Sequence, residues 1–502
     1  MARVIAVCNQ KGGVGKCMAP ETPVLLTSGE TVPIERLFEE SLNGTAVKHL
    51  DEGDGVFVRP IKPLNVFSLN DDLKIVEEKV DWVYRGKAQQ LLEVRSSRGK
   101  AARVTAEHPF LTYRNGQVTW VHAEMLREGD YVAAPRSIAT GADSARVDLL
   151  PYIPEEIFVR VSDRRVVATN LEAIMARGGS LRDALLSRLL SGEAGAGELY
   201  GIAKKGVTFK YLRRFSRDGT VSRQRNGRRE FVYSVNRERV IDDVMERGFS
   251  VRVFRALGLP RGIVRDFVYT NASGHTCQPM RPVFTLDAEL ARFVALAITE
   301  GYLGPSRLIF FNSSPELLKI FAEYCEALGL SYRQEQLDTQ GKITVSGAGT
   351  LMKFLESVFE MPLRGNRKSF HVKFPRVILR APREILGAYI GTYIDGDGYV
   401  ARGRATVEIA SASYENIVGF QYAFLRFGIN AQIKSKYGEA SNSPHPQRRL
   451  YHSVVVSGSR DLGTVRDYIP LSVPAKRERL AVACELDHNT NQVNEDNPVF
   501  TE

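Results

Sequence analysis

The feature that most constrains the fold is an internal repeat within residues 281–470. Each copy begins with an apolar segment, from Leu290 to Gly301 and from Leu386 to Gly398, and each segment ends in an acid followed by glycine. Alternating runs typical of strands, a second helix and a further strand follow in the same order in both copies. The repeat therefore predicts two similar halves, about 281–380 and 381–470, that mix helices with strands.

The apolar segments predict two helices that pack closely, because small residues such as Ala295 and Gly391 lie within them. Each helix would end in a carboxylate, Glu300 or Asp397, although a helix C-terminus is already negative. Two such carboxylates close together also repel each other. A divalent cation relieves both problems, and Mg²⁺ prefers oxygen ligands and bridges to phosphate. We therefore predict that Glu300 and Asp397 are Mg²⁺ ligands, one in each half.

This repeat resembles the monomeric LAGLIDADG homing endonucleases. The resemblance implies an α+β duplicated domain with pseudo-twofold αββαββα halves that cuts double-stranded DNA as a monomer. Lys373 resembles the family's basic residue between the two motifs and would stabilise the transition-state phosphate; a simple phosphate contact or a solvated lysine is an equal alternative. A degenerate remnant that binds DNA without cutting it is the alternative for the whole domain.

In that family the strands of both halves lie in the major groove of the target. The basic residues expected to contact bases or phosphates there are Arg307, Arg333, Lys342, Arg402, Arg404, Lys434, Lys436, Arg448 and Arg449.

The start of the chain has a different character. Residues 4–7 are an apolar run that predicts a buried parallel strand, and a glycine-rich phosphate loop follows, with Lys11, Gly12, Gly13, Gly15 and Lys16. This resembles the deviant Walker A motif of ParA/MinD-type partition ATPases. That family has Ser or Thr after the last lysine, where this chain has Cys17, and Pro20 disfavours the expected helix. Residues 1–16 are therefore interpreted as a fragment of a host ATPase, whose activity would appear only after splicing.

Cys17 opens a second pattern. Residues 17–26, the segment from Thr105 to His108, and residues 120–132 resemble, in the right order, the blocks of an intein splicing domain of the Hint type. The resemblance covers about residues 17–136 and implies an all-β splicing domain.

The chemistry of splicing explains the residue types at these positions. A thiolate at Cys17 attacks the carbonyl of Lys16 and turns the amide into a thioester. By resemblance, His108 protonates the leaving nitrogen and Thr105 helps to hold the site. Taken singly, Cys17 is better explained as an inert small residue, and Thr105 and His108 as polar residues at a strand end. Together the three residues favour splicing.

The C-terminal splicing block departs from the family. An intein ends in strands and a His-Asn pair before Cys, Ser or Thr, and the late match here is His488, Asn489 and Thr490. Residues 471–487 are charged and predict a helix instead. We therefore favour one half of a split element, completed by a separate C-terminal fragment, or a gene truncated after the endonuclease, with residues 471–502 as a tail. A genuine junction at Asn489 remains the alternative.

Positive charge is concentrated in one part of the chain. The net charge is +10, and residues 204–266 hold 17 Lys/Arg against 7 Asp/Glu, which is +10 in that stretch alone. Residues 137–280 are therefore interpreted as an accessory DNA-binding region, with a basic linker as the alternative. Runs at Val221 and Phe231 predict the strands of a hairpin within it.

Cysteines and hydropathy bear on the compartment. The five cysteines show no CxxC pair and no zinc-ligand spacing, which is typical of a reducing cytoplasm. No signal peptide and no apolar run of membrane-spanning length is seen, so we expect a cytoplasmic protein without a membrane partner.

Overall fold

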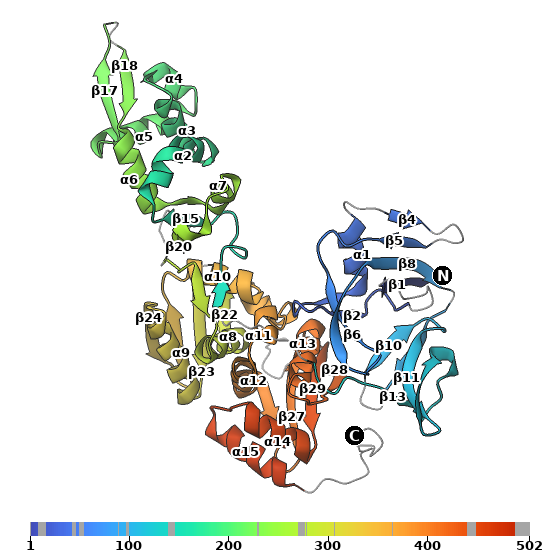
Figure 1. The fold of residues 1–502 in the computed structure, drawn as a ribbon. Coiled ribbons are helices and arrows are strands. Elements are labelled where there is room, and N and C mark those ends of the chain that lie inside the picture. The colour runs from blue at the N-terminus through green and yellow to red at the C-terminus, as the bar shows by residue number, and fades with distance from the viewer. Residues whose placement is uncertain are drawn as a thin grey trace.

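The chain is described from a computed structural model. It describes residues 2–8, 17–42, 47–49, 55–88, 90–96, 100–138, 146–227, 230–269, 277, 279–305, 307–363, 365–438 and 448–486. Figure 1 shows three units: a β-rich unit near the N-terminus, a mostly helical middle unit, and a third unit of helices and sheets. The protein is therefore multi-domain. No helix among these residues is both long and apolar enough to cross a membrane.

The β-rich unit consists of short antiparallel strands and one helix. The helix, α1 (Ile34–Leu42), buries Ile34 and Phe38 against Val58 and Val83 of the strands. The strands are β2 (Pro23–Leu25), β3 (Thr31–Pro33), β4 (Val47–His49), β5 (Val56–Val58), β6 (Asn65–Leu69), β7 (Ile75–Lys79), β8 (Trp82–Ala88), β9 (Leu92–Arg95), β10 (Ala101–Val104), β11 (Pro109–Arg114), β12 (Gln117–His122) and β13 (Tyr131–Val132), with a 3-10 turn η1 (Ala123–Met125). The unit is thus predominantly, but not entirely, β.

The N-terminal strand does not have the predicted parallel neighbours. β1 (Ala2–Cys8) is a strand, but it pairs antiparallel with β8, from Ala2 opposite Ala88 to Cys8 opposite Trp82. The backbone groups of a strand need hydrogen-bond partners, and the edge of β8 supplies them for β1. The prediction of a strand is confirmed, and the prediction of a parallel one is wrong.

The middle unit is attached to the third unit by a short strand pair, β14 (Arg146–Asp148) with β21 (Val283–Thr285). Its further elements are β15 (Phe158–Val161), α2 (Arg164–Arg177), α3 (Leu181–Leu190), β16 (Ala194–Gly195), α4 (Ala196–Tyr200), α5 (Lys205–Arg217), β17 (Val221–Arg225), β18 (Phe231–Val235), α6 (Arg237–Arg247), β19 (Phe249–Ser250), α7 (Val251–Ala256), η2 (Arg261–Ile263) and β20 (Val264–Val268). The predicted hairpin is the antiparallel pair of β17 and β18.

The third unit repeats one order of elements twice. Its first half has α8 (Ala288–Thr299), β22 (Gly301–Gly304), β23 (Arg307–Asn312), α9 (Pro315–Ala327), β24 (Tyr332–Gln336), β25 (Gly341–Val345) and α10 (Gly349–Phe359). Its second half has α12 (Arg383–Asp397), β26 (Gly398–Val400), β27 (Thr406–Ser411), α13 (Tyr414–Leu425), β28 (Gln432–Gly438), β29 (Arg449–Ser457) and α14 (Ser459–Tyr468). The short helices η3 (Gly365–Phe370) and α11 (Arg376–Arg380) join the halves, and α15 (Pro474–Glu485) follows the second.

The two sheets of this unit have the same strand order. The first is β22-β23-β25-β24 and the second is β26-β27-β29-β28. One face of each sheet is buried, through Leu308 and Ile343 in the first half and Val407 and Val454 in the second. Because side chains alternate along a strand, the opposite faces are left open.

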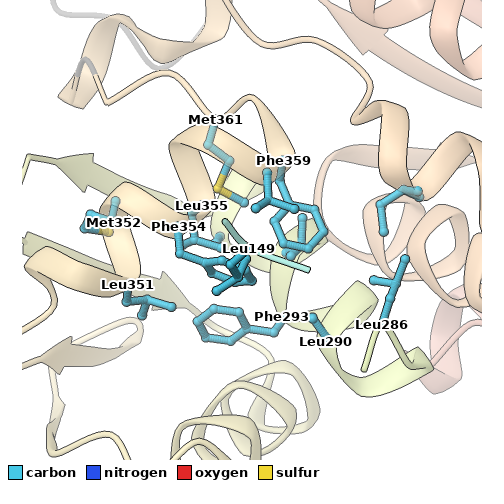
Figure 2. Close-up of a cluster of buried hydrophobic side chains, with 14 of the residues drawn as sticks. Leu149, Leu286, Leu290, Phe293, Leu351, Met352, Phe354, Leu355, Phe359 and Met361 are labelled. Atoms are coloured by element: carbon cyan, nitrogen blue, oxygen red, sulfur yellow. The ribbon is translucent and has the colours of Figure 1, made fainter. Parts of the chain in front are cut away.

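A shared core ties the first half to the linker that precedes it. Figure 2 shows Leu149, which follows β14, among side chains of α8 and α10 that include Leu290, Phe293 and Phe354. Leu149 is fully buried, as is Phe293. The middle unit is therefore anchored through buried apolar surface as well as through the strand pair.

Helices α8 and α12 pack side by side, as the small residues predicted, but the contacts of one glycine differ from the expectation. The space left by Gly391 is filled by the backbone of Pro470, not by α8. The glycine that faces α8 is Gly396, next to Thr299. The pattern of small residues identified the helices correctly, but it could not show which neighbour each glycine meets.

Candidate functional site

The two predicted acids lie at the ends of the two adjacent helices. Glu300 is the residue after the last turn of α8, and Asp397 is the last residue of α12. Burial raises the pKa of Glu300, and the charge of Asp397 raises it further. Asp397 reaches solvent, yet crowding by neighbouring atoms raises its pKa too, while Lys368 and Lys476 oppose the rise. The helices therefore bring together two carboxylates, and the charge of Asp397 disfavours the charged form of Glu300.

Two lysines hold the ends of these helices in equivalent ways. Lys368, in η3, donates to the backbone oxygens of Ala297, Thr299 and Gly301. Lys476, in α15, donates to the oxygens of Ile394, Asp395, Gly396 and Gly398, at 2.7, 2.8, 3.5 and 2.9 Å. In both halves the lysine reaches the carbonyls three residues before, one before and one after the acid. Each lysine thereby satisfies carbonyls that a helix C-terminus leaves without a partner.

Burial lowers the pKa of both lysines. Burial lowers the pKa of Lys368 to about 8, although Asp397 and Glu300 act in the opposite direction. Burial also lowers the pKa of Lys476, again against the effect of nearby carboxylates. The site is thus a cluster of two acids and two lysines at one end of the helix pair.

Lys373, the basic residue expected between the motifs, has a different partner. Its amino group forms an ion pair of 2.7 Å with Glu415 at the start of α13. The lysine between the motifs that influences Glu300 and Asp397 is Lys368. The structure therefore places Lys368 near the two acids and Lys373 against Glu415.

Asp395 is a third acid near this site, and it faces inward. It accepts hydrogen bonds from the backbone nitrogens of Ser472 at 2.5 Å and Val473 at 3.2 Å, just before α15. Arg292 of α8 donates to the hydroxyl of Ser472 at 3.1 Å. Burial raises the pKa of Asp395 to about 6 even though these backbone donors act against the rise. Asp395 thereby fixes the segment that presents Lys476.

Sequence reasoning missed Lys368, Lys476 and Asp395. A signal was present, because each lysine follows the third helix of its half, α10 or α14. Residues 471–487 were predicted to be charged and helical, and α15 is such a helix. The interpretation as a tail separated this helix from the unit to which Lys476 connects it.

The predicted DNA-contacting residues occupy mostly the open faces and turns of the two sheets. The pairing places Arg333 and Lys342 on the open face of the first sheet and Lys434, Lys436 and Arg449 on that of the second. Arg307 starts β23, while Arg402 and Arg404 are exposed in the turn before β27. Arg448 lies over the ring of Tyr437 and Arg449 over that of Phe370. Acids moderate this charge, because Glu335 pairs with both Arg333 and Lys342 at 2.9 Å.

A second candidate site surrounds Cys17 in the β-rich unit. The side chain of Cys17 is buried among Tyr84, Ala88 and Leu91. Its carbonyl accepts a hydrogen bond of 3.0 Å from the backbone nitrogen of Thr105. The backbone nitrogen of His108 donates a hydrogen bond of 3.0 Å to the carbonyl oxygen of Thr105, which closes a tight turn. The structure therefore brings the three predicted splicing residues into one region.

Lys11, Gly12, Gly13, Gly15 and Lys16 of the phosphate loop lie outside the described residues, as do His488, Asn489 and Thr490.

The acids at the helix ends fit a divalent metal. Both raised pKa values reflect unfavourable negative charge, which a cation would compensate. The donor oxygens are hard ligands of the kind that Mg²⁺ takes, and two carboxylates leave positions for water and phosphate. Within the described residues no group of three or more acids, histidines or cysteines forms a complete metal cage. The arrangement suits a metal shared with a phosphate-containing substrate.

Comparison with known proteins gives a domain for part of the third unit. Residues 384–470 match the LAGLIDADG-like domain. This range runs from α12 through α14, so the second half of the repeat carries a LAGLIDADG-like domain.

Several curated proteins are similar over most of the chain. The chain is 26% identical over 490 residues to a probable translation initiation factor IF-2 of Thermococcus kodakarensis, covering 97% of this chain and 35% of that protein. It is 23% identical over 455 residues to elongation factor 2 of Methanopyrus kandleri, with 89% and 31% covered. It is 22% identical over 485 residues to a replication factor C small subunit of Methanocaldococcus jannaschii, with 95% and 17% covered. The chain thus spans only a minor part of the length of each.

Several solved structures resemble parts of the chain, and two examples follow. The match to the TvoVMA intein has 25% sequence identity and a TM-score of 0.23. It covers 26% of this chain and 74% of the intein chain. The match to I-DmoI in complex with DNA and Ca has 13% sequence identity and a TM-score of 0.27. It covers 38% of this chain and 97% of the I-DmoI chain.

Proposed function

We propose that this chain is a protein-splicing element that carries a site-specific, metal-dependent DNA endonuclease. The observation that carries the endonuclease is the pair Glu300 and Asp397, each at the end of one of two packed helices whose terminal carbonyls are held by a lysine. The C-terminus of a helix is an unfavourable place for an acid, and the repetition of this arrangement in both halves favours a function over chance.

The pattern of relatives supports an inserted element. Nearly the whole chain aligns with a minor part of an initiation factor, an elongation factor and a replication factor. These names describe different tasks, so the shared segment is better explained by something that enters many hosts than by any one host activity. An intein that carries a homing endonuclease has this property.

In the endonuclease, the chain's own residues position the DNA and the reacting groups. The open sheet faces, with Lys434 and Lys436 in one half and Arg333 and Lys342 in the other, grip the duplex on either side of the helix pair. Glu300 and Asp397 would hold Mg²⁺, which when bound supplies an activated water and steadies the leaving oxygen. Lys368 and Lys476 keep the helix ends in place and add positive charge where the phosphate gains negative charge. One acid in each half matches the requirement to cut both strands of the DNA.

In the splicing unit, Cys17 is the nucleophile. Its thiolate attacks the carbonyl carbon of residue 16, the C–N bond to Cys17 breaks, and a thioester forms while the freed nitrogen takes a proton from His108. Thr105 holds the strand end beside Cys17, because its backbone nitrogen donates to the Cys17 carbonyl. The host is proposed to be a partition-type ATPase interrupted within its phosphate loop.

The C-terminal half of splicing is proposed to come from a separate chain or to have been lost. Intact-mass measurement of the purified chain, with and without a small thiol, tests this. Thiol-dependent release of residues 1–16 alone is expected for a live Cys17 without its C-terminal block. A second break after Asn489 would overturn the split or truncated form, and an unchanged mass in Cys17→Ala provides the control.

The endonuclease is tested on a plasmid that carries the uninterrupted phosphate-loop gene. The chain should linearise it in Mg²⁺ and leave it intact in excess chelator. Glu300→Ala and Asp397→Ala should abolish linear product, whereas Lys373→Ala, with its amino group against Glu415, should retain it. If both acid variants cut the plasmid as well as the wild type does, the assignment of Glu300 and Asp397 is overturned. If the wild type binds the DNA but does not cut it, the degenerate remnant is favoured.

A further inference from the structure

Six consecutive elements of the middle unit form a recognisable small fold. In chain order they are α3, β16, α4, α5, β17 and β18. β16 pairs with β18, at Ala194 opposite Tyr233, and β18 pairs with β17 along the hairpin, which gives the sheet order β16-β18-β17. Helix, strand, helix, turn, helix and hairpin in this connection is the winged form of the helix-turn-helix. Figure 1 shows the hairpin projecting at the end of the middle unit away from the third unit.

The sequence explains why this segment folds as a module. Ser180 caps α3 by accepting a hydrogen bond from the Asp183 nitrogen. Leu186 of α3, Leu199 of α4, Leu212 of α5 and Tyr233 of β18 are all buried in one core. Each helix therefore contributes apolar side chains to the core, which fixes α4 against α5 and both against the hairpin.

Helix α5 has one apolar face and one basic face. Thr208, Leu212 and Phe215 are buried, at the spacing of one helix face. Residues two positions away, such as Lys210 and Arg213, lie on the opposite side because successive residues turn by about 100°. No atom lies within 4 Å of the position that a Cβ on Gly206 would occupy, so the start of this face is open.

Positive charge is concentrated in one stretch of this module. Between residues 204 and 225 there are eight lysines and arginines and one acid, Asp218. None of these basic residues forms an ion pair with an acid in the part of the chain that the structure describes. The exposed basic residues of α5 and the hairpin are Lys205, Lys210, Arg213, Arg214, Arg217, Arg223 and Arg225.

Several arginines elsewhere in the middle unit have acidic partners. Arg164 pairs with Glu238 and Asp242, and Arg237 pairs with Glu172. Arg182 and Arg247 pair with Asp243 and Asp183 respectively. Acids therefore neutralise part of the positive charge in the rest of the middle unit, whereas no ion pair among the described residues neutralises the basic residues of α5 and the hairpin.

We infer that α5 enters the major groove of duplex DNA and that the β17–β18 hairpin contacts the adjacent phosphates. An α-helix fits the width of the major groove of B-form DNA, whereas the deep, narrow groove of A-form RNA excludes it. The exposed Val207 and Phe209 give the first turns of α5 apolar surface for base edges such as thymine methyl groups. The inference deepens the proposed endonuclease by adding a second DNA-binding element, anchored through β14 and β21, outside the duplicated sheets.

The test compares the full chain with Lys210→Ala/Arg213→Ala. Both side chains are exposed on a helix, so alanine preserves the fold, which the far-UV circular dichroism and melting curve of the variant should confirm. Binding is measured by fluorescence anisotropy across a salt series, on a long duplex with the uninterrupted gene and on an unrelated duplex of equal length. The variant should bind both duplexes roughly ten-fold more weakly or worse, and its slope of log K against log salt should fall by about 2.

The matched control is Arg239→Ala, which removes an exposed arginine from α6 of the same unit. It should leave affinity and slope unchanged. Unchanged binding by the α5 variant overturns the inference, and so does equal competition by double-stranded RNA. Absence of cleavage by the wild type would instead count against the proposed endonuclease alone, because the α5-dependent binding would still be measured.

Discussion

Gly396 of α12 lies so close to Thr299 of α8 that a Cβ on the glycine would be 2.5 Å from the threonine hydroxyl oxygen. That distance is shorter than any real Cβ contact, so the two helix ends meet only because residue 396 lacks a side chain. The same hydroxyl donates to the Ala295 carbonyl at 3.0 Å, which fixes its position. Glu300 and Asp397 follow these two residues directly, so this contact sets where the acids stand relative to each other.

Gly396→Ala should therefore separate the helix ends and impair cleavage. An extra methyl group in a packed seam typically costs about 1–3 kcal/mol, and small displacements of reacting groups cost rate as well. Thr299→Gly should partly restore activity in the double variant, because it removes the three atoms nearest to the new methyl group. Gly463→Ala in α14 is the control, since no atom lies within 4 Å of its added Cβ. Independent effects of the Gly396 and Thr299 changes in a double-mutant cycle would contradict the contact.

Removal of either helix-end lysine should reduce cleavage more than binding. Lys368→Met and Lys476→Met each leave several terminal carbonyls without their donor and remove positive charge beside the acids. Loss of one such group typically lowers a rate by about 10²-fold or more. Each variant should accumulate nicked circular plasmid, because one half remains intact. Lys373→Met, whose lysine pairs with Glu415, should behave like the wild type; equal losses in all three variants would argue against the assignment of Lys368 and Lys476.

Asp395→Ala should loosen α15 from the third unit. The substitution leaves the backbone nitrogens of Ser472 and Val473 without an acceptor, and an unsatisfied buried donor costs about 1–3 kcal/mol. Hydrogen exchange within residues 474–485 should rise, with much smaller changes in α8 and α9. Asp467→Ala, whose carboxylate is exposed and pairs with the neighbouring Arg466, serves as the control. Exchange that rises uniformly over the whole unit would show general destabilisation instead.

The sequence predicted the elements of the third unit well, because the repeat provides two independent views of one pattern. Glu300 and Asp397 were predicted correctly as the helix-end acids, since their position follows from the helices themselves. Lys368 and Lys476 were not predicted as partners of those acids, because each reaches its helix from a segment far along the chain and no local periodicity records such a contact. Lys373 was chosen instead from its neighbourhood in sequence. The direction of β1 was wrong for the same reason: a strand's apolar pattern says nothing about which edge it will join.

Neutralising one of the two acids should stabilise the metal-free protein while it abolishes cutting. The pKa of Glu300 is raised in the fold, so its charged form is disfavoured relative to the unfolded chain, and this penalty is present at neutral pH and disappears as the group is protonated on acidification. Glu300→Gln should therefore raise the melting temperature in chelator. Mg²⁺ should raise the melting temperature of the wild type through binding to the native state, but not that of the variant. Glu326→Gln on α9 is the matched control for the loss of one charge. A variant that is less stable than the wild type without metal would mean that Lys368 and Lys476 already compensate the acids, and that these positions need no cation.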